Sequence, residues 1–508
     1  MTPLLNWWTD AEKAASWLII GKGPSFEARG DYDLSGFRVI SLNHIVREMP
    51  VEIAHMIDLD VLRDCAEAIE TNARFLLMPR VPHVKGAPQS KTLDELKTEF
   101  PILERLGQQN RLLWYNLAQS PGVPELSPWQ FKKQNKNNSK DKQSTPTPES
   151  FVVPMGHFSG EVVTTILGML GAKKIRTLGL DGGQKYAAQF SDLDKTRLDN
   201  GHENFDVQAH GIADAIQRYD LDYGPLNSET PMRFFIGTDE SQLLGAKLLE
   251  YSIRKHSTIS STFDDMMHVK APMPQDPGNR PRTNFSFNRF AIPALAGHQG
   301  RAVYVDADMQ VFRDARDLWD TPFGDAKVLH APSSSPTRPF QLSVLLMDCS
   351  RLDWTLDKIV ADLDSGKLTY DSLMKEFKLE PEGALKPGLS TDWNSLEEYH
   401  AGRTGLIHYT DMHTQPWVFG RNPNGDEWVG YLKSALREEF VSWEDLKEAQ
   451  SKGYLRPSLM WQLKLPRKVW PIFNRTFGRI LDRGFKAHQA TFVRVQSERA
   501  QATAAVAT

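Results

Sequence analysis

The sequence predicts an α/β protein made of two Rossmann-like α/β domains followed by a helical tail. A chain of 508 residues with 40% hydrophobic content exceeds a single core and can fill two or three. Strand-like apolar runs alternate with helical patterns in the first half, and the same alternation restarts near residue 232. We therefore predict domains at 1–228 and 229–440 and a helical, basic tail at 441–508.

Composition narrows the function before any motif is considered. The formal charge of −4 argues against a nucleic-acid partner, whose binding surface would be strongly basic. Two cysteines far apart in sequence, Cys65 and Cys349, support neither a disulfide framework nor a zinc site. The first residues lack a secretory signal, and no apolar run approaches the ~18 residues that span a bilayer. The sequence thus favours a cytoplasmic protein, either soluble or peripheral at the inner face of the membrane.

The first domain begins with an apolar strand at 17–20 that runs into the loop Gly21-Lys-Gly-Pro-Ser25. Such a glycine-rich turn after a strand lets the backbone approach a phosphate or ribose, although the spacing lacks the dinucleotide fingerprint. The following elements are strands at 38–42, 53–57 and 75–78, a helix at 60–71, a helix from 159 to 170 and a strand that ends in Asp181.

Residues 132–150 interrupt this pattern with a polar, lysine-containing stretch that has too little apolar surface to offset the entropy of ordering it. We predict a disordered insertion, and its lysines leave open a role in gating an anionic ligand.

The second domain opens with a strand at 232–237 and a helix at about 241–256. Its most informative stretch is the apolar run 301–311, which contains Asp306 and Asp308 one residue apart. Alternate side chains of a strand share a face, so both carboxylates can bind one divalent cation. A second apolar strand delivers His408, a suitable third ligand for manganese. The pattern predicts a metal site for a nucleotide diphosphate, although a strand ending in a polar turn looks the same.

The stretch from about 232 to 430 resembles glycosyltransferase family 8, the glycogenin-like enzymes of the GT-A fold. The parts follow the family's order: a strand end, an arginine segment, the Asp-x-Asp strand, a strand resembling Phe-Asn-Ser-Gly-Val, and a closing His...Pro-Trp motif. This resemblance implies a Mn²⁺- or Mg²⁺-dependent, retaining hexosyltransferase that uses a UDP-sugar. The implied roles are nucleotide contacts from Thr238, Asp239, Arg289 and Asp306, metal ligands Asp306, Asp308 and His408, and catalytic Gln341 and Asp392.

Two departures from the family pattern concern the closing motif and the acceptor side. Gln415 replaces the usual lysine before Pro-Trp, which leaves the cation for the diphosphate to another residue, His413 or Arg421. The family's Asp-Gln-Asp segment has its nearest equivalent in Asp392-Trp-Asn394.

The first domain resembles, more faintly, the family 42 sialyltransferases, which bind a cytidine nucleotide. The matching blocks are Gly-Lys-Gly-Pro-Ser, Ser-Leu-Asn, Ser-Gly and Leu-Gly-Leu-Asp. Lys22 takes the place of an asparagine, and the family's catalytic histidine has no clear counterpart, with His202 and His210 as alternatives. The implied nucleotide-binding residues are Gly21, Gly23, Ser25, Asn43, Ser159 and Gly160.

The segment 452–486 carries nine lysines and arginines and a single acid, Asp482, interleaved with aromatic residues. This composition suits peripheral contact with an anionic membrane. A packing arm against the second domain and a dimer contact are equally open interpretations.

The function predicted from these patterns is transfer of a sugar from a UDP-sugar to a glycan or lipid-linked acceptor in polysaccharide biosynthesis, with a second activity in the first domain. The alternative is one active GT-A domain beside a non-catalytic N-terminal binding domain. A nucleotide-binding protein with decayed sites and a metal-dependent nucleotidyltransferase are further alternatives; the latter does not explain the His...Pro-Trp motif.

Overall fold

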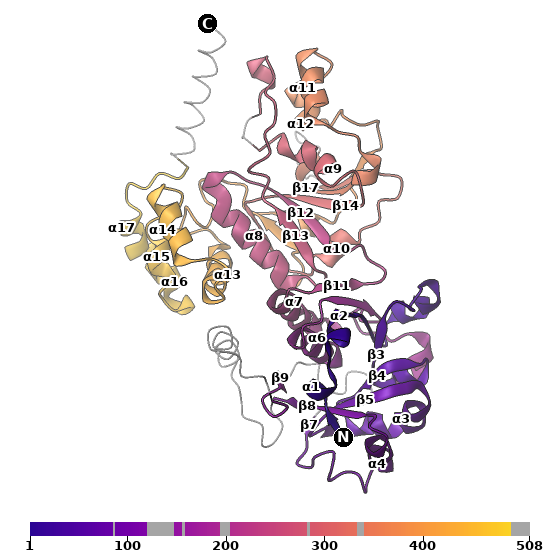
Figure 1. Cartoon of the computed structure of the whole chain (residues 1–508). Coiled ribbons are helices and arrows are strands. Elements are labelled where there is room, and N and C mark those ends of the chain that lie inside the picture. Colours follow the sequence, from indigo (N-terminus) through magenta and orange to yellow (C-terminus); the bar gives the residue numbers. More distant parts are fainter. Residues whose placement is uncertain are drawn as a thin grey trace. The chain divides into compact units, whose positions relative to one another are not determined.

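The computed structural model describes residues 1–84, 87–118, 147–154, 158–193, 204–281, 285–332 and 340–488. The chain forms two compact units, Met1–Pro231 with Thr258–Ser260 (unit 1) and Met232–Ser257 with Ser261–Thr508 (unit 2). Both are α/β, which confirms the predicted fold class (Figure 1). Residues 132–146 of the predicted insertion, and His202, lie outside the described residues.

Unit 1 is built on a nine-stranded sheet in the order β1-β8-β5-β4-β3-β2-β10-β11, with β9 added to β8. All of its neighbouring strands are parallel, as short strands joined by helices require. The strands are β1 Thr2–Pro3, β2 Ser16–Ile20, β3 Arg38–Leu42, β4 Val51–His55, β5 Ala73–Pro79, β8 Leu112–Leu117, β9 Val152–Val153, β10 Lys174–Leu178 and β11 Asp222–Pro225.

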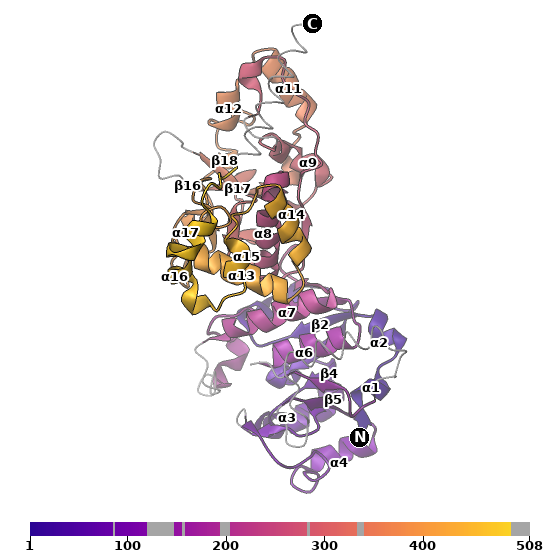
Figure 2. The same ribbon diagram turned by 90° about the vertical axis from the view of Figure 1, so that its left-hand side faces the viewer.

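Helices cover both faces of this sheet, because successive strand side chains point to opposite sides. Trp17 and Ile19 of β2 belong to one hydrophobic cluster and Leu18 and Ile20 to another. The helices α6 and α7 pack on the first face, and α3 and α4 on the opposite one (Figure 2). Their bounds are α3 Leu59–Asn72, α4 Pro101–Gln108, α6 Ser159–Met169 and α7 Gln208–Tyr219.

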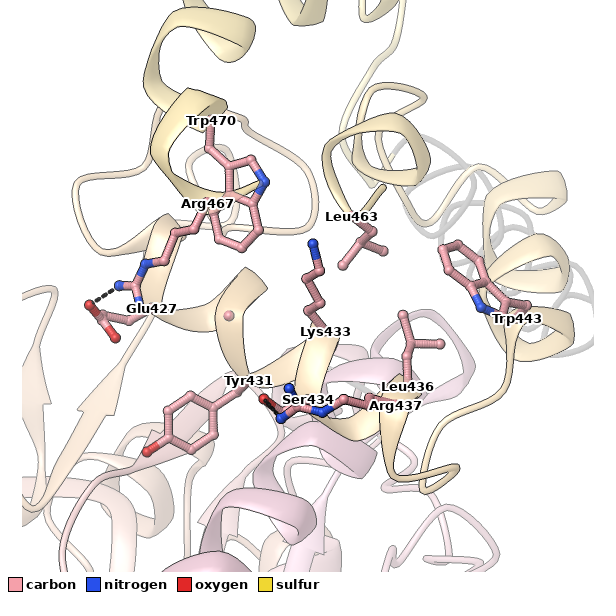
Figure 3. Close-up of a pocket in the computed structure, with 11 residues that line it drawn as sticks. Glu427, Tyr431, Lys433, Ser434, Leu436, Arg437, Trp443, Leu463, Arg467 and Trp470 are labelled. Atoms are coloured by element: carbon pink, nitrogen blue, oxygen red, sulfur yellow. Dashed lines mark hydrogen bonds and ion pairs between the residues drawn. The ribbon is translucent and has the colours of Figure 1, made fainter. Parts of the chain in front are cut away.

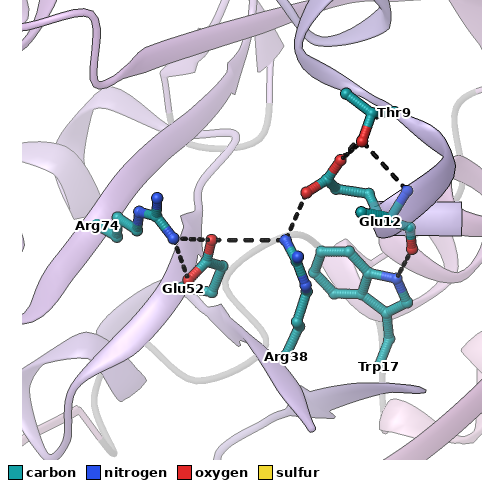
Figure 4. A network of polar contacts seen from close by, with 7 residues as sticks. Thr9, Glu12, Trp17, Arg38, Glu52 and Arg74 are labelled. Carbon is teal, nitrogen blue, oxygen red and sulfur yellow. Dashed lines mark hydrogen bonds and ion pairs between the residues drawn. The ribbon is translucent and has the colours of Figure 1, made fainter. Parts of the chain in front are cut away.

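A polar network ties the N-terminal helix α2 (Asp10–Ala14) to the sheet (Figure 4). Arg38 of β3 lies 2.6 Å from the Glu12 carboxylate and 3.8 Å from that of Glu52, and Trp17 Nε1 donates to the Glu12 carbonyl at 2.8 Å. Burial raises the pKa of Glu12, but hydrogen bonds from Thr9 and the charge of Arg38 outweigh it and hold the pKa below its usual value. The network keeps the start of the chain in register with β2 and β3.

The strand order of unit 1 reverses at β2. From β2 the chain runs outward through β3, β4, β5 and β8, and later returns to place β10 and β11 on the other side of β2. Such a reversal leaves a crevice beyond the carboxyl ends of the two central strands, which is where open α/β sheets bind ligands. The loops after β2 and β10 both begin at these carboxyl ends.

Unit 2 contains a six-stranded mixed sheet in the order β13-β12-β14-β17-β16-β18. The strands β12, β13 and β14 are parallel, whereas β17 is antiparallel to β14 and β16. The strands are β12 Met232–Gly237, β13 Ser261–Asp264, β14 Arg301–Asp306, β16 Val328–Pro332, β17 Phe340–Asp348 and β18 Leu385–Lys386.

A second sheet of three short strands, in the order β15-β20-β19, follows the end of β14. Its strands are β15 Met309–Val311, β19 Ser395–Leu396 and β20 Leu406–His408. The helix α8 (Leu243–His256) packs beside β15, and the backbone N–H of Val311 donates to the Ser252 hydroxyl at 3.0 Å. This small sheet joins chain segments that are about a hundred residues apart.

The C-terminal helices belong to unit 2 and share a hydrophobic cluster with α8 and the 409–418 segment. Trp417, Trp428 and Trp470 are almost fully buried in that cluster. The helices, yellow in Figure 1, are α13 Gly425–Arg437, α14 Trp443–Ser451, α15 Leu459–Gln462, α16 Trp470–Arg475 and α17 Phe477–Leu481.

None of the helices in the described part of the chain is long and apolar enough to cross a membrane.

Candidate metal and donor site

The predicted metal ligands come together where β14 ends. Side-chain ligand atoms of Asp306, Asp308 and His408 all lie within 4.8 Å of one another. Asp306 is the last residue of β14 and Asp308 immediately precedes β15. His408 reaches them because β20 runs antiparallel to β15, with His408 opposite Met309. We call these three residues the carboxylate–histidine group.

The hydrogen bonds of His408 determine which nitrogen faces the carboxylates. Its Nδ1 lies 3.1 Å from Oδ1 of Asn394, an acceptor, so Nδ1 carries the hydrogen. Nε2 therefore turns its lone pair toward Oδ1 of Asp308, 3.2 Å away. Two acceptors at this distance need a proton or a cation between them, and Asp308 Oδ1 has no hydrogen-bond partner among the described residues. The donor set fits a divalent metal held by two carboxylates and an imidazole.

Burial and the charges of neighbouring residues shift the pKa values of Asp306 and His408. Burial raises the pKa of Asp306, the Arg289 guanidinium opposes this shift, and the nearby Asp308 carboxylate adds to it. Burial lowers the pKa of His408, but the charges of Asp308 and Asp306 outweigh burial and leave the pKa above its ordinary value. A divalent cation stabilises the ionised carboxylates and the neutral imidazole together.

Arg289, which the family resemblance places near the donor, is buried beside this group. Its Nη2 lies 3.9 Å from Asp306 Oδ1, and its guanidinium carbon lies 4.5 Å from the centre of the Tyr304 ring. Nη1 donates to the Leu342 carbonyl at 2.5 Å. Because Gln341 precedes Leu342 in β17, the backbone of Gln341 also lies close to this arginine. The side chain of Gln341 is outside the described residues.

Thr238 and Asp239, the predicted nucleoside contacts, come directly after β12, the strand beside β14. Gly237 at the end of β12 pairs with Asp306, so Thr238 and Asp239 come directly beside the carboxylate–histidine group. Thr238 is 2% exposed, and the Asp239 carboxylate accepts from the N–H and hydroxyl of Ser241 at 2.9 and 2.6 Å. These residues thus lie at adjacent strand ends.

Asp392 lies in the turn Thr391–Trp393, and Asn394 ends that turn. Although they are close in sequence, their side chains contact different residues. The Asp392 carboxylate accepts from Arg403 Nε at 3.0 Å. Asn394, two residues later, makes the contact with His408 and is almost fully buried. Asn394 has no role predicted from sequence, and its only signal there was its place in the Asp-Trp-Asn segment.

The residue that replaces the family lysine is part of the site. Gln415 is fully buried, and its Nε2 donates to Asp308 Oδ2 and to the Tyr409 carbonyl, each at 3.0 Å. It therefore orients Asp308 without adding charge. His413 and Arg421, the two alternatives for the missing cation, are exposed, and the Arg421 guanidinium lies over the Phe419 ring.

A buried arginine from the tail holds the Pro-Trp segment that follows Gln415. Arg456 is 1% exposed, its Nε donates to the Pro416 carbonyl at 3.2 Å, and its backbone N–H donates to the Trp417 carbonyl at 2.9 Å. Burial lowers the pKa of Arg456 to about 10. Nothing in the sequence signalled this contact, because forty residues separate the partners.

The candidate nucleotide loop of unit 1 follows β2 at the carboxyl edge of the sheet. The N–H groups of Gly21 and Gly23 donate to the carbonyls of Leu178 and Gly179, each at 2.8 Å, and the Ser25 hydroxyl donates to Asp181 at 2.6 Å. A Cβ on Gly160 would meet Leu180 at 2.9 Å, so the start of α6, Ser159 and Gly160, adjoins the loop after β10.

Asn43 follows β3 with a φ of 55°, and its buried Oδ1 has no hydrogen-bond partner among the described residues. His210, one of two candidate catalytic histidines, is exposed on α7.

A groove of about 600 Å³ lies among the C-terminal helices (Figure 3). It contains no member of the carboxylate–histidine group. Figure 3 shows Trp443 and Trp470 on opposite sides of it, with the ion pair of Glu427 and Arg467 at one end. Aromatic and cationic side chains therefore line this part of the tail together.

Part of the chain that contains the two site carboxylates matches a family of known proteins. Residues 226–370 match the model of "Glycosyl transferase family 8". The family 8 resemblance is confirmed for this segment. It contains Asp306 and Asp308, whereas His408 lies beyond the matched residues. This part of the chain is a glycosyltransferase domain.

Relatives cover only part of the chain. "Protein CDI" of Arabidopsis thaliana is 31% identical over 98 residues, which are 18% of this chain and 38% of that protein. GlyE of Streptococcus pneumoniae TIGR4 is 18% identical with a TM-score of 0.29, over 45% of this chain and 65% of that one. The galactosyltransferase LgtC, crystallised with donor and acceptor sugar analogues, is 14% identical with a TM-score of 0.29, over 40% and 96%.

Asn394 is expected to tune metal binding through His408. In Asn394→Ala the imidazole loses the contact that fixes its tautomer, and we expect Mn²⁺ affinity to fall by about 10- to 100-fold. Isothermal titration calorimetry with the full chain measures this. Asp392→Asn, in the same turn but paired with Arg403, is the matched control and should bind Mn²⁺ like the wild type. Equal affinities for wild type and Asn394→Ala would contradict the assignment.

Proposed function

We propose that the protein is a metal-dependent glycosyltransferase that moves a sugar from a UDP-sugar to a glycan or lipid-linked acceptor. The observation that carries the proposal is the carboxylate–histidine group, Asp306, Asp308 and His408, at the strand ends of a domain matching family 8. Paired carboxylates and an imidazole suit Mn²⁺ or Mg²⁺. When bound, such a cation supplies a Lewis acid for the leaving nucleoside diphosphate.

The neighbouring residues can bind and orient the donor. In the proposed complex, Thr238 and Asp239 contact the nucleoside, since they follow the strand beside Asp306. Ser241 fixes the Asp239 carboxylate through two hydrogen bonds, which leaves its rotamer defined before any ligand arrives. Binding to such a preorganised group costs little side-chain entropy.

Arg289 and Gln341 are assigned to the sugar side of the donor. Arg289 is held by the Leu342 carbonyl and by the Tyr304 ring, so its charge stays fixed near Asp306. Gln341 comes from the same stretch of β17 and is proposed to contact the sugar ring. Following the family resemblance, we propose retaining transfer: the bond from the anomeric carbon to the diphosphate breaks, the acceptor oxygen bonds to the same face, and its proton leaves with the diphosphate.

Nucleotide-sugar hydrolysis tests this proposal. We expect the purified chain to release UDP from one member of a UDP-sugar panel with Mn²⁺, and chelation to abolish release. Asp308→Ala should reduce release by at least about 100-fold, because loss of one metal ligand removes several kcal/mol of stabilisation of the leaving group. The exposed Asp357→Ala, elsewhere in unit 2, is the control. Release that is indifferent to chelator and to Asp308→Ala would rule out the metal-dependent mechanism.

Unit 1 supports a second candidate function, binding of a cytidine nucleotide. The observation that favours it is Asn43, whose buried Oδ1 has no hydrogen-bond partner in the described part of the chain and lies at the end of the strand next to β2. Lys22 of the glycine loop offers a charge, with its Nζ 4.4 Å from the Tyr186 ring centre, and burial lowers its pKa to about 8. The alternative remains a non-catalytic unit beside one active domain.

Two asparagines with the same backbone conformation allow a matched test of unit 1. Asn43 and Asn110 both have φ 55°, but Asn110 is exposed. We expect Asn43→Ala to weaken CMP binding by about tenfold, as loss of one hydrogen bond to a buried group does, and Asn110→Ala to leave it unchanged. Calorimetric titration of CMP into the full chain measures both. No CMP binding by the wild type would favour the non-catalytic alternative.

The tail supports peripheral contact of the protein with an anionic membrane. Ile472, Phe477 and Ile480 are 68%, 67% and 69% exposed, and Phe477 and Ile480 share one helix face. Arg475 and Arg479, both exposed, lie next to them in sequence. Exposed apolar side chains flanked by cations are the composition of an interfacial helix.

Vesicle sedimentation tests the membrane contact. With phosphatidylserine-containing vesicles, we expect Phe477→Asp to reduce the bound fraction by about tenfold or more, because burial of a phenylalanine contributes about 1.5–3 kcal/mol. Leu295→Asp, which changes another exposed apolar residue of unit 2, is the control. Equal sedimentation of wild type and Phe477→Asp would refute membrane contact through α17.

A further inference from the structure

The groove among the C-terminal helices is separate from the carboxylate–histidine group, and the proposed transfer step does not use it. One wall is a single face of α13, whose lining residues are spaced three or four positions apart: Glu427, Gly430, Tyr431, Ser434 and Arg437. Residues of the segment 463–470 line the other side. Ten residues of an α-helix extend about 15 Å, so this wall is long enough for an extended ligand.

Gly430 keeps the middle of the α13 wall open. A glycine inside a helix is less favourable than an alanine, because it loses more backbone entropy on folding. Among the described residues, a Cβ at this position would meet only Nη1 of Arg467, at 3.7 Å, which is an ordinary van der Waals distance. Packing within the described chain therefore does not require a glycine here. The missing side chain instead leaves space in the groove for a ligand.

Aromatic side chains lie on two sides of the groove (Figure 3). Trp443 is 36% exposed, so part of its indole ring is open to a ligand. Trp470 is 1% exposed and its Nε1 donates to the Leu465 carbonyl at 3.2 Å, which makes it a fixed wall. The C–H groups on the face of a pyranose ring pack against such rigid apolar surfaces, while its hydroxyl groups bond to polar groups at the rim.

The described lining carries more positive than negative charge. Its cations are Lys433, Arg437 and Arg467, and its carboxylate is that of Glu427, which pairs with Arg467. Lys433 Nζ donates to the Leu465 carbonyl at 2.7 Å, a neutral partner that leaves the ammonium charge uncompensated.

The charge of Arg437 is also only weakly compensated. Its Nη2 lies 3.3 Å from the Ser434 hydroxyl and 4.0 Å from the Glu438 carboxylate. That carboxylate lies closer to Lys255, at 3.3 Å. The Arg437 side chain is 55% exposed, so its guanidinium is accessible to an anionic group of a ligand. Charge complementarity therefore favours an acidic occupant.

Tyr431 connects the groove to the body of the glycosyltransferase unit. Its ring centre lies 5.7 Å from that of Phe312, the residue after β15, and its hydroxyl lies 2.6 Å from Nε2 of His256 in α8. The groove wall is thus built on the same small sheet and helix that position Asp308 and His408. A chain held in the groove stays attached to the body that carries the proposed transfer site.

We propose that this groove binds an acidic oligosaccharide, a segment of the acceptor glycan that carries carboxylate or phosphate groups and lies away from the transfer site. Arginine binds either anion through paired N–H donors. The described lining consists of helices and the turns between them, which provide no strand edge for an extended peptide to join. The inference rests on the proposed function, because it takes that glycan to be the acceptor.

Binding of defined oligosaccharides tests this inference without donor or metal. We expect calorimetry with the full chain to detect hexagalacturonate, which carries carboxylates, or pentamannose phosphate, and to detect no binding of neutral maltohexaose. Gly430→Leu fills the groove and should weaken acidic binding by at least about tenfold. Its melting temperature should be no lower than that of the wild type, because leucine favours a helix. Trp443→Ala and Arg437→Gln should each weaken binding by about 3- to 10-fold.

Matched controls separate the groove from the rest of the tail. Trp461→Ala removes another exposed tryptophan, and Phe477→Asp removes the proposed membrane contact. Both variants should bind the acidic oligosaccharides like the wild type. UDP release by Gly430→Leu in the absence of acceptor should also equal that of the wild type.

The possible outcomes distinguish this inference from the proposed function. Absence of binding to both acidic oligosaccharides, equal binding of maltohexaose, or equal affinities of wild type and Gly430→Leu would each overturn the inference. Metal-dependent UDP release by the same preparation would then leave the proposed function standing. Acidic binding that Gly430→Leu abolishes, without UDP release from any UDP-sugar, would overturn the proposed function and retain the groove as a glycan-binding site.

Discussion

The candidate site depends on the antiparallel pairing of β15 with β20, which places His408 opposite Met309 and next to Asp308. A slip of one residue would turn the imidazole to the other face of this small sheet and leave the two carboxylates without their third partner. The register is supported from outside the sheet: the Ser252 hydroxyl accepts from the Val311 N–H, and Tyr409 N–H donates to the Asp308 carbonyl at 2.9 Å. Three short strands can specify a register only because α8 and the C-terminal helices bury one side of them.

Charge balance explains why the neighbours of this group are mostly neutral. The two carboxylates are partly buried, and one guanidinium, that of Arg289, lies 3.9 Å from Asp306. Tyr304, Asn394 and Gln415 contribute hydrogen bonds to the group and no charge. A lysine at position 415 would neutralise Asp308 in the absence of a metal, whereas the amide orients the carboxylate and leaves its charge for a cation. Gln415 therefore adds no positive charge beside Asp308.

The features that could be predicted from the sequence are those that depend on residues close together in the chain. Alternation and apolar runs identified the strands that end in Asp306 and His408, the glycine loop after β2, and the α/β class of both units. The sequence did not predict Asn394 or Arg456, because their contacts with the site are made by tertiary packing, and a single polar residue in a loop or a basic tail has no periodicity. Gln341 occupies the expected strand, but its side chain is not described, so its role remains a prediction.

The glycine loop of unit 1 can be explained either by phosphate binding or by the close packing of two loops. A Cβ on Gly21 would lie 2.4 Å from the Gly179 carbonyl oxygen, and one on Gly23 would lie 2.6 Å from the Asp181 carboxylate. The loops after β2 and β10 therefore require glycine in order to pack against each other, whether or not a phosphate binds nearby. A ligand in this unit is therefore indicated only by groups that the packing leaves unsatisfied. Asn43 is such a group: its left-handed backbone and its unpartnered buried Oδ1 are both costs that the loop packing does not explain. A bound nucleotide edge would compensate for the second cost, so Asn43, rather than the glycines, decides between a nucleotide site and a scaffold.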